Sequence, residues 1–289
     1  MDERAAKRKR RLRFIRKLLR NKSIVVGGTL VAFYIVIAVF APMLVMHDPY
    51  AMDFEMHDPP SFEHPFGTDG YGRDVLSRVL IGSRISLIIG ITVVVVRGVV
   101  GVTLGLIAGY YGGWIDVVIM RITDVFLSIP TLILAMGIMA ILGGSFVNLL
   151  LALSIKNWTS FARVTRSEVL SLKENVYIEA ARACGVPNRR IIFSHILRNL
   201  ASTLFVYGSM NVAYPILGET FLSFLGLGLD PPTISWGRML ALDRAYLTDA
   251  WWSSVFPGLA VLTLVLAFNL MGDGLRDVFD PQMVDAQGH

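Results

Sequence analysis

Long apolar runs with almost no charge dominate the chain. A transmembrane helix needs about 20 mainly apolar residues to cross about 30 Å of hydrocarbon. The run at 125–155 is too long for one crossing, and Gly143, Gly144 and Ser145 near its middle suit a tight turn into a second leg from about Phe146 to Phe161. Six spans follow, so the pattern predicts an all-α polytopic membrane protein. The apolar runs lie at 24–46, 85–111, 125–155, 200–217 and 251–271.

Composition and charge support a bilayer as the solvent and predict an orientation. Hydrophobic residues make up 54% of the chain and charged residues 17%, with a mean hydropathy of +0.59, which is too apolar for a water-soluble domain of this length. Loops rich in Lys and Arg stay in the cytoplasm. Residues 1–22 carry eleven basic residues against two acids, 47–80 carry two against seven, and 163–198 carry seven against three. We therefore expect both termini and the 163–198 loop on the cytoplasmic side of the cell membrane.

The same boundaries divide the chain into successive segments. We expect a basic cytoplasmic segment at 1–22, a first transmembrane helix at 23–46, an extracytoplasmic loop at 47–82, a five-helix core at 83–276 with a cytoplasmic loop at 166–198, and a cytoplasmic tail at 277–289. The basic start could be read as a nucleic-acid tail. Basic residues directly before an apolar helix more simply bind anionic lipid, so we expect membrane lipid, and no nucleic acid, as its partner.

Glycines at a four-residue spacing mark one face of the second predicted span. Gly101, Gly105 and Gly109 fall on the same side of a helix, where the lack of side chains lets another backbone approach closely. We interpret them as a helix-packing face. The spacing leaves open whether this face packs within the chain or against a partner chain.

Charged residues inside the predicted spans are candidates for a pathway or a gate. Arg97 is the one charge in the run 85–111, and charges at membrane depth usually face a cavity or a partner. It either lines a translocation route, where it meets a carboxylate of the substrate or of a partner, or belongs to a buried structural pair. Glu219 follows Pro215 near the outer end of the fifth span and is either part of an outer gate or a helix-end residue hydrogen-bonded to nearby backbone. Asp124 is expected to pair with Arg121.

The segment from Glu179 to Arg198 carries a compact motif in the predicted cytoplasmic loop. Its first part, Glu179-Ala180-Ala181 followed by Gly185, is typical of a short helix with a smooth surface that ends at a glycine. Pro187 then suits the start of a second helix. We interpret the segment as two short helices joined by an elbow, against which another protein can lie.

With this motif in a six-span protein, the sequence resembles a binding-protein-dependent ABC permease, closest to the C-type subunit of dipeptide, oligopeptide and nickel importers. The resemblance runs from about Ile24 to Pro281. It departs from the usual pattern at Arg198, where a proline is common, and at His195, where an aliphatic residue is common. Further segments that carry the resemblance are His64 to Asp69, Gly72 to Asp74, Ala108 to Gly113, Leu222 to Gly228 and Phe268 to Asp277.

The resemblance implies the type I ABC importer fold and transport of dipeptides or oligopeptides by alternating access. It implies a heterodimer with a second, similar permease, an extracytoplasmic binding protein and two ATPase subunits that use ATP and Mg²⁺. In this family the elbow is the coupling element, so Glu179, Ala180, Ala181 and Gly185 would contact an ATPase. Nickel and oligosaccharides remain alternative substrates.

The chain's own motifs give no sign of an enzyme. It has no phosphate-binding Gly-x-x-x-x-Gly-Lys-Ser/Thr loop, no His-Glu-x-x-His helix and no Gly-x-Ser-x-Gly elbow. We expect no catalytic residue, no metal site and no cofactor in this chain, and its single cysteine, Cys184, excludes an internal disulfide. A channel or a proton-driven secondary transporter is the alternative from another class. Such a protein would need no elbow and would more typically carry a carboxylate relay within its spans.

Overall fold

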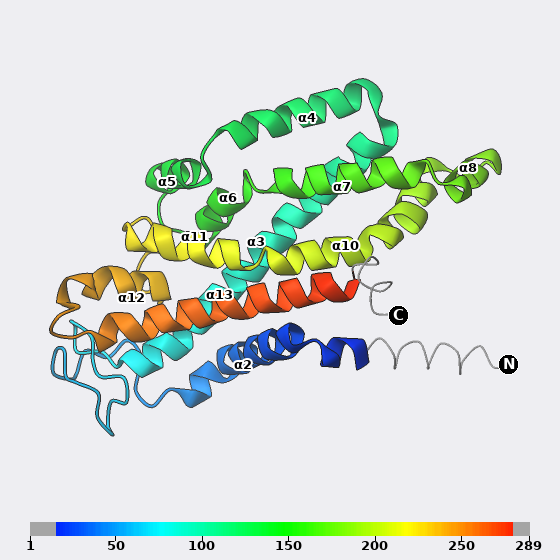
Figure 1. Cartoon of the computed structure of the whole chain (residues 1–289). Helices are drawn as coiled ribbons and strands as arrows, with labels where there is room; N and C mark the ends of the chain where they lie inside the picture. The colour runs from blue at the N-terminus through cyan, green and yellow to red at the C-terminus, as the bar shows by residue number, and fades with distance from the viewer. Residues whose placement is uncertain (1–15, 280–289) are drawn as a thin grey trace.

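The computed structural model describes residues 16–279, and the regular structure in that range is helical, with one isolated bridge between Thr68 and Asp74 and no strand. The expected segments at 1–22 and 277–289 therefore lie largely outside the described residues. Helices α2, α13, α10 and α7 lie side by side, and the long α3 crosses behind them (Figure 1). The principal elements are α2 (Lys22–Leu44), α3 (Val75–Tyr111), α4 (Gly113–Ser128), α5 (Thr131–Leu142), α6 (Phe146–Ser154), α7 (Trp158–Lys173), α8 (Val176–Ala183), α10 (Leu197–Met210), α11 (Ala213–Phe224), α12 (Trp236–Asp243) and α13 (Trp252–Phe279).

Four helical segments are long and apolar enough to span a membrane, at Lys22–Leu44, Val75–Tyr111, Asn188–Phe224 and Trp252–Phe279. A fifth span results if α4 and α5, which meet at a bend of 83°, count as one crossing. The turn predicted at Gly143 to Ser145 does separate α5 from α6. The predicted second leg from Phe146 to Phe161, however, is interrupted after α6 ends at Ser154. The next helix, α7, carries the charged residues Arg163, Arg166 and Glu168. The sixth span therefore stays a prediction.

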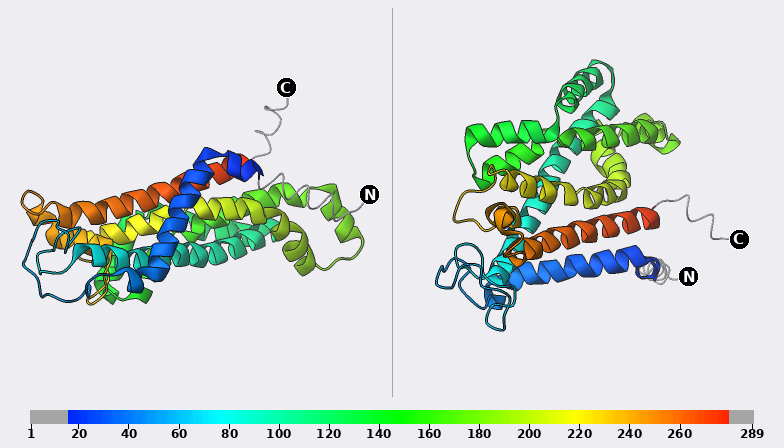
Figure 2. Two further views of the ribbon diagram at one scale, coloured as in Figure 1. Left: turned by 90° about the horizontal axis from the view of Figure 1, so that it is seen from below. Right: turned by 60° about the vertical axis from the view of Figure 1, so that its left-hand side comes forward.

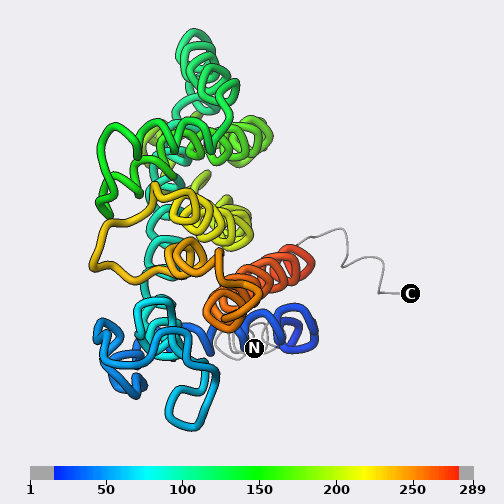
Figure 3. Tube along the Cα trace, turned by 90° about the vertical axis from the view of Figure 1, so that its left-hand side faces the viewer, coloured from blue at the N-terminus to red at the C-terminus, as the bar shows by residue number. Residues whose placement is uncertain are grey.

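The molecule has two different ends. The loop 45–74 and the connection between α11 and α12 lie at one end, whereas α8 and the described ends of α2 and α13 lie at the other (Figures 1 and 2). Seen along the helices from the loop end, α2 and α13 lie beside each other, and α4 lies at the far edge (Figure 3). We call these the loop end and the elbow end.

The loop end is folded by buried polar contacts. Asp74, which is fully buried, caps α3 by accepting from the Ser77 backbone N–H at 2.7 Å, so α3 begins ten residues before the apolar run that predicted it. His64 Nδ1 lies 3.1 Å from the same carboxylate. Trp252 Nε1, at the start of α13, donates to the Thr68 carbonyl at 3.1 Å. These contacts tie the loop to two membrane helices.

A seam of close packing joins α3 to α7. A Cβ atom placed on Gly101 would lie 2.3 Å from the Trp158 carbonyl oxygen, and one on Gly105 would lie 2.6 Å from the Ala162 carbonyl oxygen. One on Gly109 would lie 2.8 Å from Val169 Cβ. Only glycine permits this approach, because any side chain would collide with the facing helix. The structure thus places the glycine face against α7 of the same chain.

Candidate functional site

The elbow is a Schellman-type turn that leaves α8 exposed. Gly185 takes a φ of +77°, which L side chains rarely adopt, and its N–H bonds the Arg182 carbonyl while the Val186 N–H bonds the Ala181 carbonyl. The sequence suggested a second short helix beyond Pro187, but the chain does not form one there. It passes through a short helical turn (Asn188–Arg190) and a π-helical segment (Ile191–Ile196) directly into α10.

Few side chains hold α8 to the rest of the protein. Ile178 alone among its residues is fully buried, in a cluster with Ile191, Ile196 and Leu200, and the Arg182 guanidinium lies 5.1 Å from the centre of the Tyr110 ring. Glu179, Ala180 and Gly185 are exposed and Ala181 is half-buried. Val176 and Tyr177 are 80% and 43% exposed. The elbow therefore offers an uncovered surface that combines apolar and charged groups.

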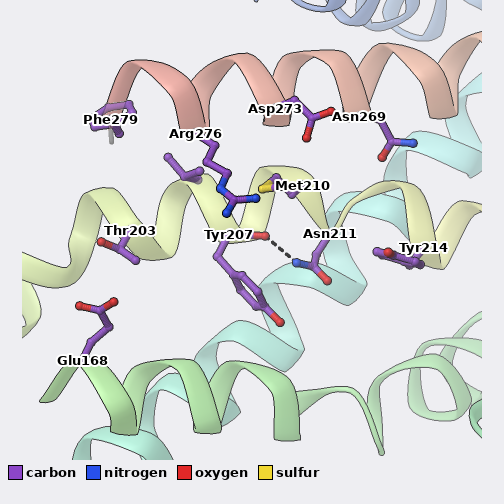
Figure 4. A pocket seen from close by; sticks show the side chains of 11 residues that line it. Glu168, Thr203, Tyr207, Met210, Asn211, Tyr214, Asn269, Asp273, Arg276 and Phe279 are labelled. Atoms are coloured by element: carbon purple, nitrogen blue, oxygen red, sulfur yellow. Dashed lines mark hydrogen bonds between the residues drawn. The ribbon is translucent and has the colours of Figure 1, made fainter. Parts of the chain in front are cut away.

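A first cavity lies at the elbow end between α7, α10 and α13. Its volume is about 830 Å³, and its charged side chains are Glu168, Asp273 and Arg276 (Figure 4). Arg276 and Asp273 reach into the space from α13, while Glu168 faces it from α7 (Figure 4). The remaining lining residues are Thr203, Val206, Tyr207, Met210, Asn211, Tyr214, Asn269 and Phe279.

A second cavity of about 790 Å³ lies farther toward the loop end, between α3, α5, α6, α7, α10 and α11. Arg97 is in its wall together with the neutral polar side chains of Asn157 and Ser160. Tyr207, Asn211 and Tyr214 line both cavities. They flank the point at Asn211 and Val212 where α10 ends and α11 begins, so a break in the helix lies between the two spaces.

Arg97 and Glu219, the two charges singled out in the sequence, have different environments. Arg97 is 3% exposed, donates an N–H to the Asn211 carbonyl oxygen, and lines the second cavity. Glu219 has no exposed surface and is not among the residues that line either cavity. Ser223 Oγ donates to Glu219 Oε1 at 2.7 Å, a side-chain contact in place of the bond to nearby backbone that one of its two interpretations expected.

Sequence reasoning missed several contacts of this region. Asp124 accepts from Arg163 Nη2 at 2.6 Å, so its expected pairing with Arg121 is wrong. Asp116 makes a two-point pair with Arg166, with both N–O distances at 2.5 Å. The shared cavity residues were also missed, although a polar Asn211 amid an apolar run four residues before Pro215 was an available signal.

A group of possible metal ligands occurs at the loop end. Ligand atoms of His47, His64 and Asp74 all lie within 4.8 Å of one another. Asp74 already accepts from His64 and from the α3 backbone, and His47 Nε2 lies 3.1 Å from the Glu63 carbonyl oxygen. These three side chains are therefore already engaged in contacts that hold the loop together, and we assign the group a structural role.

Apolar helices of spanning length, arranged around two cavities that share lining residues at a helix break, are typical of a membrane transport protein of the permease class. The model of the family described as binding-protein-dependent transport system inner membrane component matches residues 101–285. A second model, the N-terminal TM domain of oligopeptide transport permease C, matches residues 11–65. The chain belongs to the family of binding-protein-dependent transport system inner membrane components, and the resemblance found in its motifs is confirmed.

Individual relatives agree with this assignment over nearly the whole chain. The chain is 44% identical to the dipeptide transport system permease protein of Alkalihalophilus pseudofirmus, over 93% of this chain and 88% of that protein. It is 43% identical to the glutathione transport system permease protein of Pectobacterium atrosepticum, covering 93% and 90% of the two chains. Identity to the probable D,D-dipeptide transport system permease protein of Escherichia coli is 41%, covering 89% and 87%.

Proposed function

We propose that this chain is the C-type permease subunit of an ATP-driven importer for dipeptides or other short peptides. The observation that carries the proposal is the match, over about nine-tenths of the chain, to permeases named for dipeptide and glutathione transport. The chain forms half of the pathway with a second, homologous permease. Two separate ATPase subunits hydrolyse ATP with Mg²⁺, and an extracytoplasmic binding protein delivers the peptide, so this chain needs no cofactor of its own.

The proposed orientation places the elbow end, with both termini, in the cytoplasm and the loop end outside. It is supported by the seven basic residues against three acids in 163–198 and by the acidic character of 47–80. In this orientation the exposed surface of α8 faces the ATPase. Glu179, Ala180, Ala181 and Gly185 form the contact that passes ATPase closure to the membrane helices.

The two cavities fit an alternating-access pathway. Each has a volume within the range of about 300–1,000 Å³ that is usual for small-ligand sites, and they meet at the break between α10 and α11. Arg97 lines the membrane-depth cavity and contacts the substrate. Glu219, which is buried away from both cavities, holds α11 through Ser223 and has no contact with the peptide.

Transport by the reconstituted complex tests this proposal. Proteoliposomes that contain both permeases and both ATPase subunits are supplied with the binding protein and with radiolabelled dialanine or glutathione. We expect accumulation of at least one probe that requires ATP and disappears when the ATPase subunits are omitted. Uptake that persists without the ATPase would instead support a secondary transporter or a channel.

A further inference from the structure

Arg97 is a buried cation without a counter-ion among residues 16–279. Its side chain lies in α3 at membrane depth, and its one hydrogen bond is to the Asn211 carbonyl oxygen. Arg97 Nε is buried and has no hydrogen-bond partner. The nearest ring, Phe161, lies 5.9 Å from the guanidinium carbon. Among residues 16–279, Arg97 forms no ion pair. Arg78, which is buried to a similar degree, is paired with Asp69.

The cavity beside Arg97 has the composition of a site for one anionic group. No aspartate or glutamate is among its lining residues, and its other polar side chains are neutral. A guanidinium pairs with a carboxylate through two parallel N–H bonds, and such a pair is strengthened where water is scarce. A ligand that brings a carboxylate into the cavity therefore supplies the charge that Arg97 lacks.

We propose that Arg97 binds the C-terminal carboxylate of the peptide during passage and makes the permease selective for peptides whose carboxylate is free. This inference rests on the proposed function and deepens it, because it assigns selectivity to the membrane subunit as well as to the binding protein. Arg97 is bonded to Asn211 at the break between α10 and α11. Binding of a carboxylate by Arg97 thus acts on Asn211, which lies at the break between the two cavities.

The test compares a peptide that has a free carboxylate with one that does not. The complete complex in proteoliposomes, with the binding protein, takes up dialanine or dialanine amide, each at a concentration that saturates the binding protein. The variants are Arg97→Gln, which removes the charge, and Arg97→Lys, which keeps it. Arg84→Gln is the matched control, because Arg84 is an exposed arginine on the same helix.

We expect Arg97→Gln to lower dialanine uptake at least tenfold and amide uptake less than twofold. Any preference of the binding protein for one of the two probes is the same for every permease variant, so it does not affect the comparison between variants. Arg97→Lys should retain an intermediate dialanine uptake, and Arg84→Gln should equal the wild type. Co-purification of the second permease should be unchanged in all variants.

Other results would overturn the inference. Equal losses for both probes, with poor co-purification of the second permease, would assign the missing carboxylate to that subunit. Unchanged dialanine uptake by Arg97→Gln would show that Arg97 does not contact the peptide. A wild-type complex that imports neither dialanine nor glutathione would contradict the proposed function itself, and this outcome is recognised before any variant is measured.

Discussion

The seam between α3 and α7 and the elbow at α8 are neighbours along the chain, yet they differ in how much surface they bury. Along the seam, Gly101, Gly105 and Gly109 bring the two backbones into direct contact. Two residues separate the end of α7 from the start of α8, and in α8 only Ile178 is fully buried. A tightly packed pair of helices thus ends in an exposed arm. We expect α7 and α3 to move together when the arm moves, because the close contacts of the seam leave no room for them to slide.

Breaking the seam should have the largest effect. Gly101→Leu places a side chain where even a Cβ atom would lie 2.3 Å from the Trp158 carbonyl oxygen, so α3 and α7 must separate. We expect the free energy of unfolding to fall by about 3 kcal/mol, measured by thermal unfolding of the purified protein. Gly137→Leu is the control, because nothing lies within 4 Å of its Cβ position. Equal losses in the two variants would contradict the seam.

Changing the elbow should affect transport and leave stability intact. Glu179→Lys reverses a charge on the exposed face of α8, and we expect ATP-dependent uptake to fall at least tenfold. Thermal stability should stay within about 0.5 kcal/mol of the wild type, as is usual for exposed positions. Glu174→Lys makes the same change on an exposed residue just before α8 and should keep most of the uptake. A large loss of stability in Glu179→Lys would show that α8 is part of the packed core.

Weakening the tie between α4 and α7 should have an intermediate effect on stability. Asp116→Asn removes the charge from the two-point pair with Arg166, and we expect a loss of about 1 kcal/mol in thermal unfolding. Asp124→Asn is the control, because its pair with Arg163 is about half exposed and should contribute less than about 0.5 kcal/mol. A larger loss in Asp124→Asn than in Asp116→Asn would overturn this ranking.

The smallest effect concerns the loop end, far from both regions. Burial, with the nearby Asp69 carboxylate, raises the pKa of Asp243 above its ordinary value of 3.8, while the Gly70 N–H bond opposes this. The folded protein then holds a proton that the unfolded chain releases, so stability falls as pH rises from about 4 through the folded pKa. Asp243→Asn keeps an acceptor for Gly70 and should flatten this fall in unfolding midpoints measured against pH. If the unfolding midpoint of Asp243→Asn depends on pH in the same way as that of the wild type, Asp243 is not the source of the fall in stability.

Features that depend on local spacing could be predicted from the sequence. The glycine face, the turn at Gly143 and the elbow at Gly185 each follow from residues within a few turns of one another. The structure adds that the glycine face packs within the chain, against α7, a choice that spacing alone left open. The start of α3 was placed too late, because Asp74 caps the helix outside the apolar run.

Features that depend on distant partners could not be predicted. Asp116 and Arg166 are 50 residues apart, and Asp124 and Arg163 are 39 apart. Their pairing requires knowledge of how α4 crosses α7. The two cavities likewise arise only when α3, α7, α10, α11 and α13 are placed together. The position of Arg97 in a cavity wall, and of Glu219 away from both cavities, could not be known before that arrangement was known.

The central claim, that α8 seats on the ATPase, can be tested through the native Cys184. This residue is exposed at the end of α8 and is the chain's single cysteine. The measurement is the rate at which a maleimide labels Cys184 in the permease pair, with and without the ATPase subunits bound. We predict that bound ATPase slows labelling at least tenfold. An equal rate in an intact complex would contradict the assignment of the elbow as the coupling element.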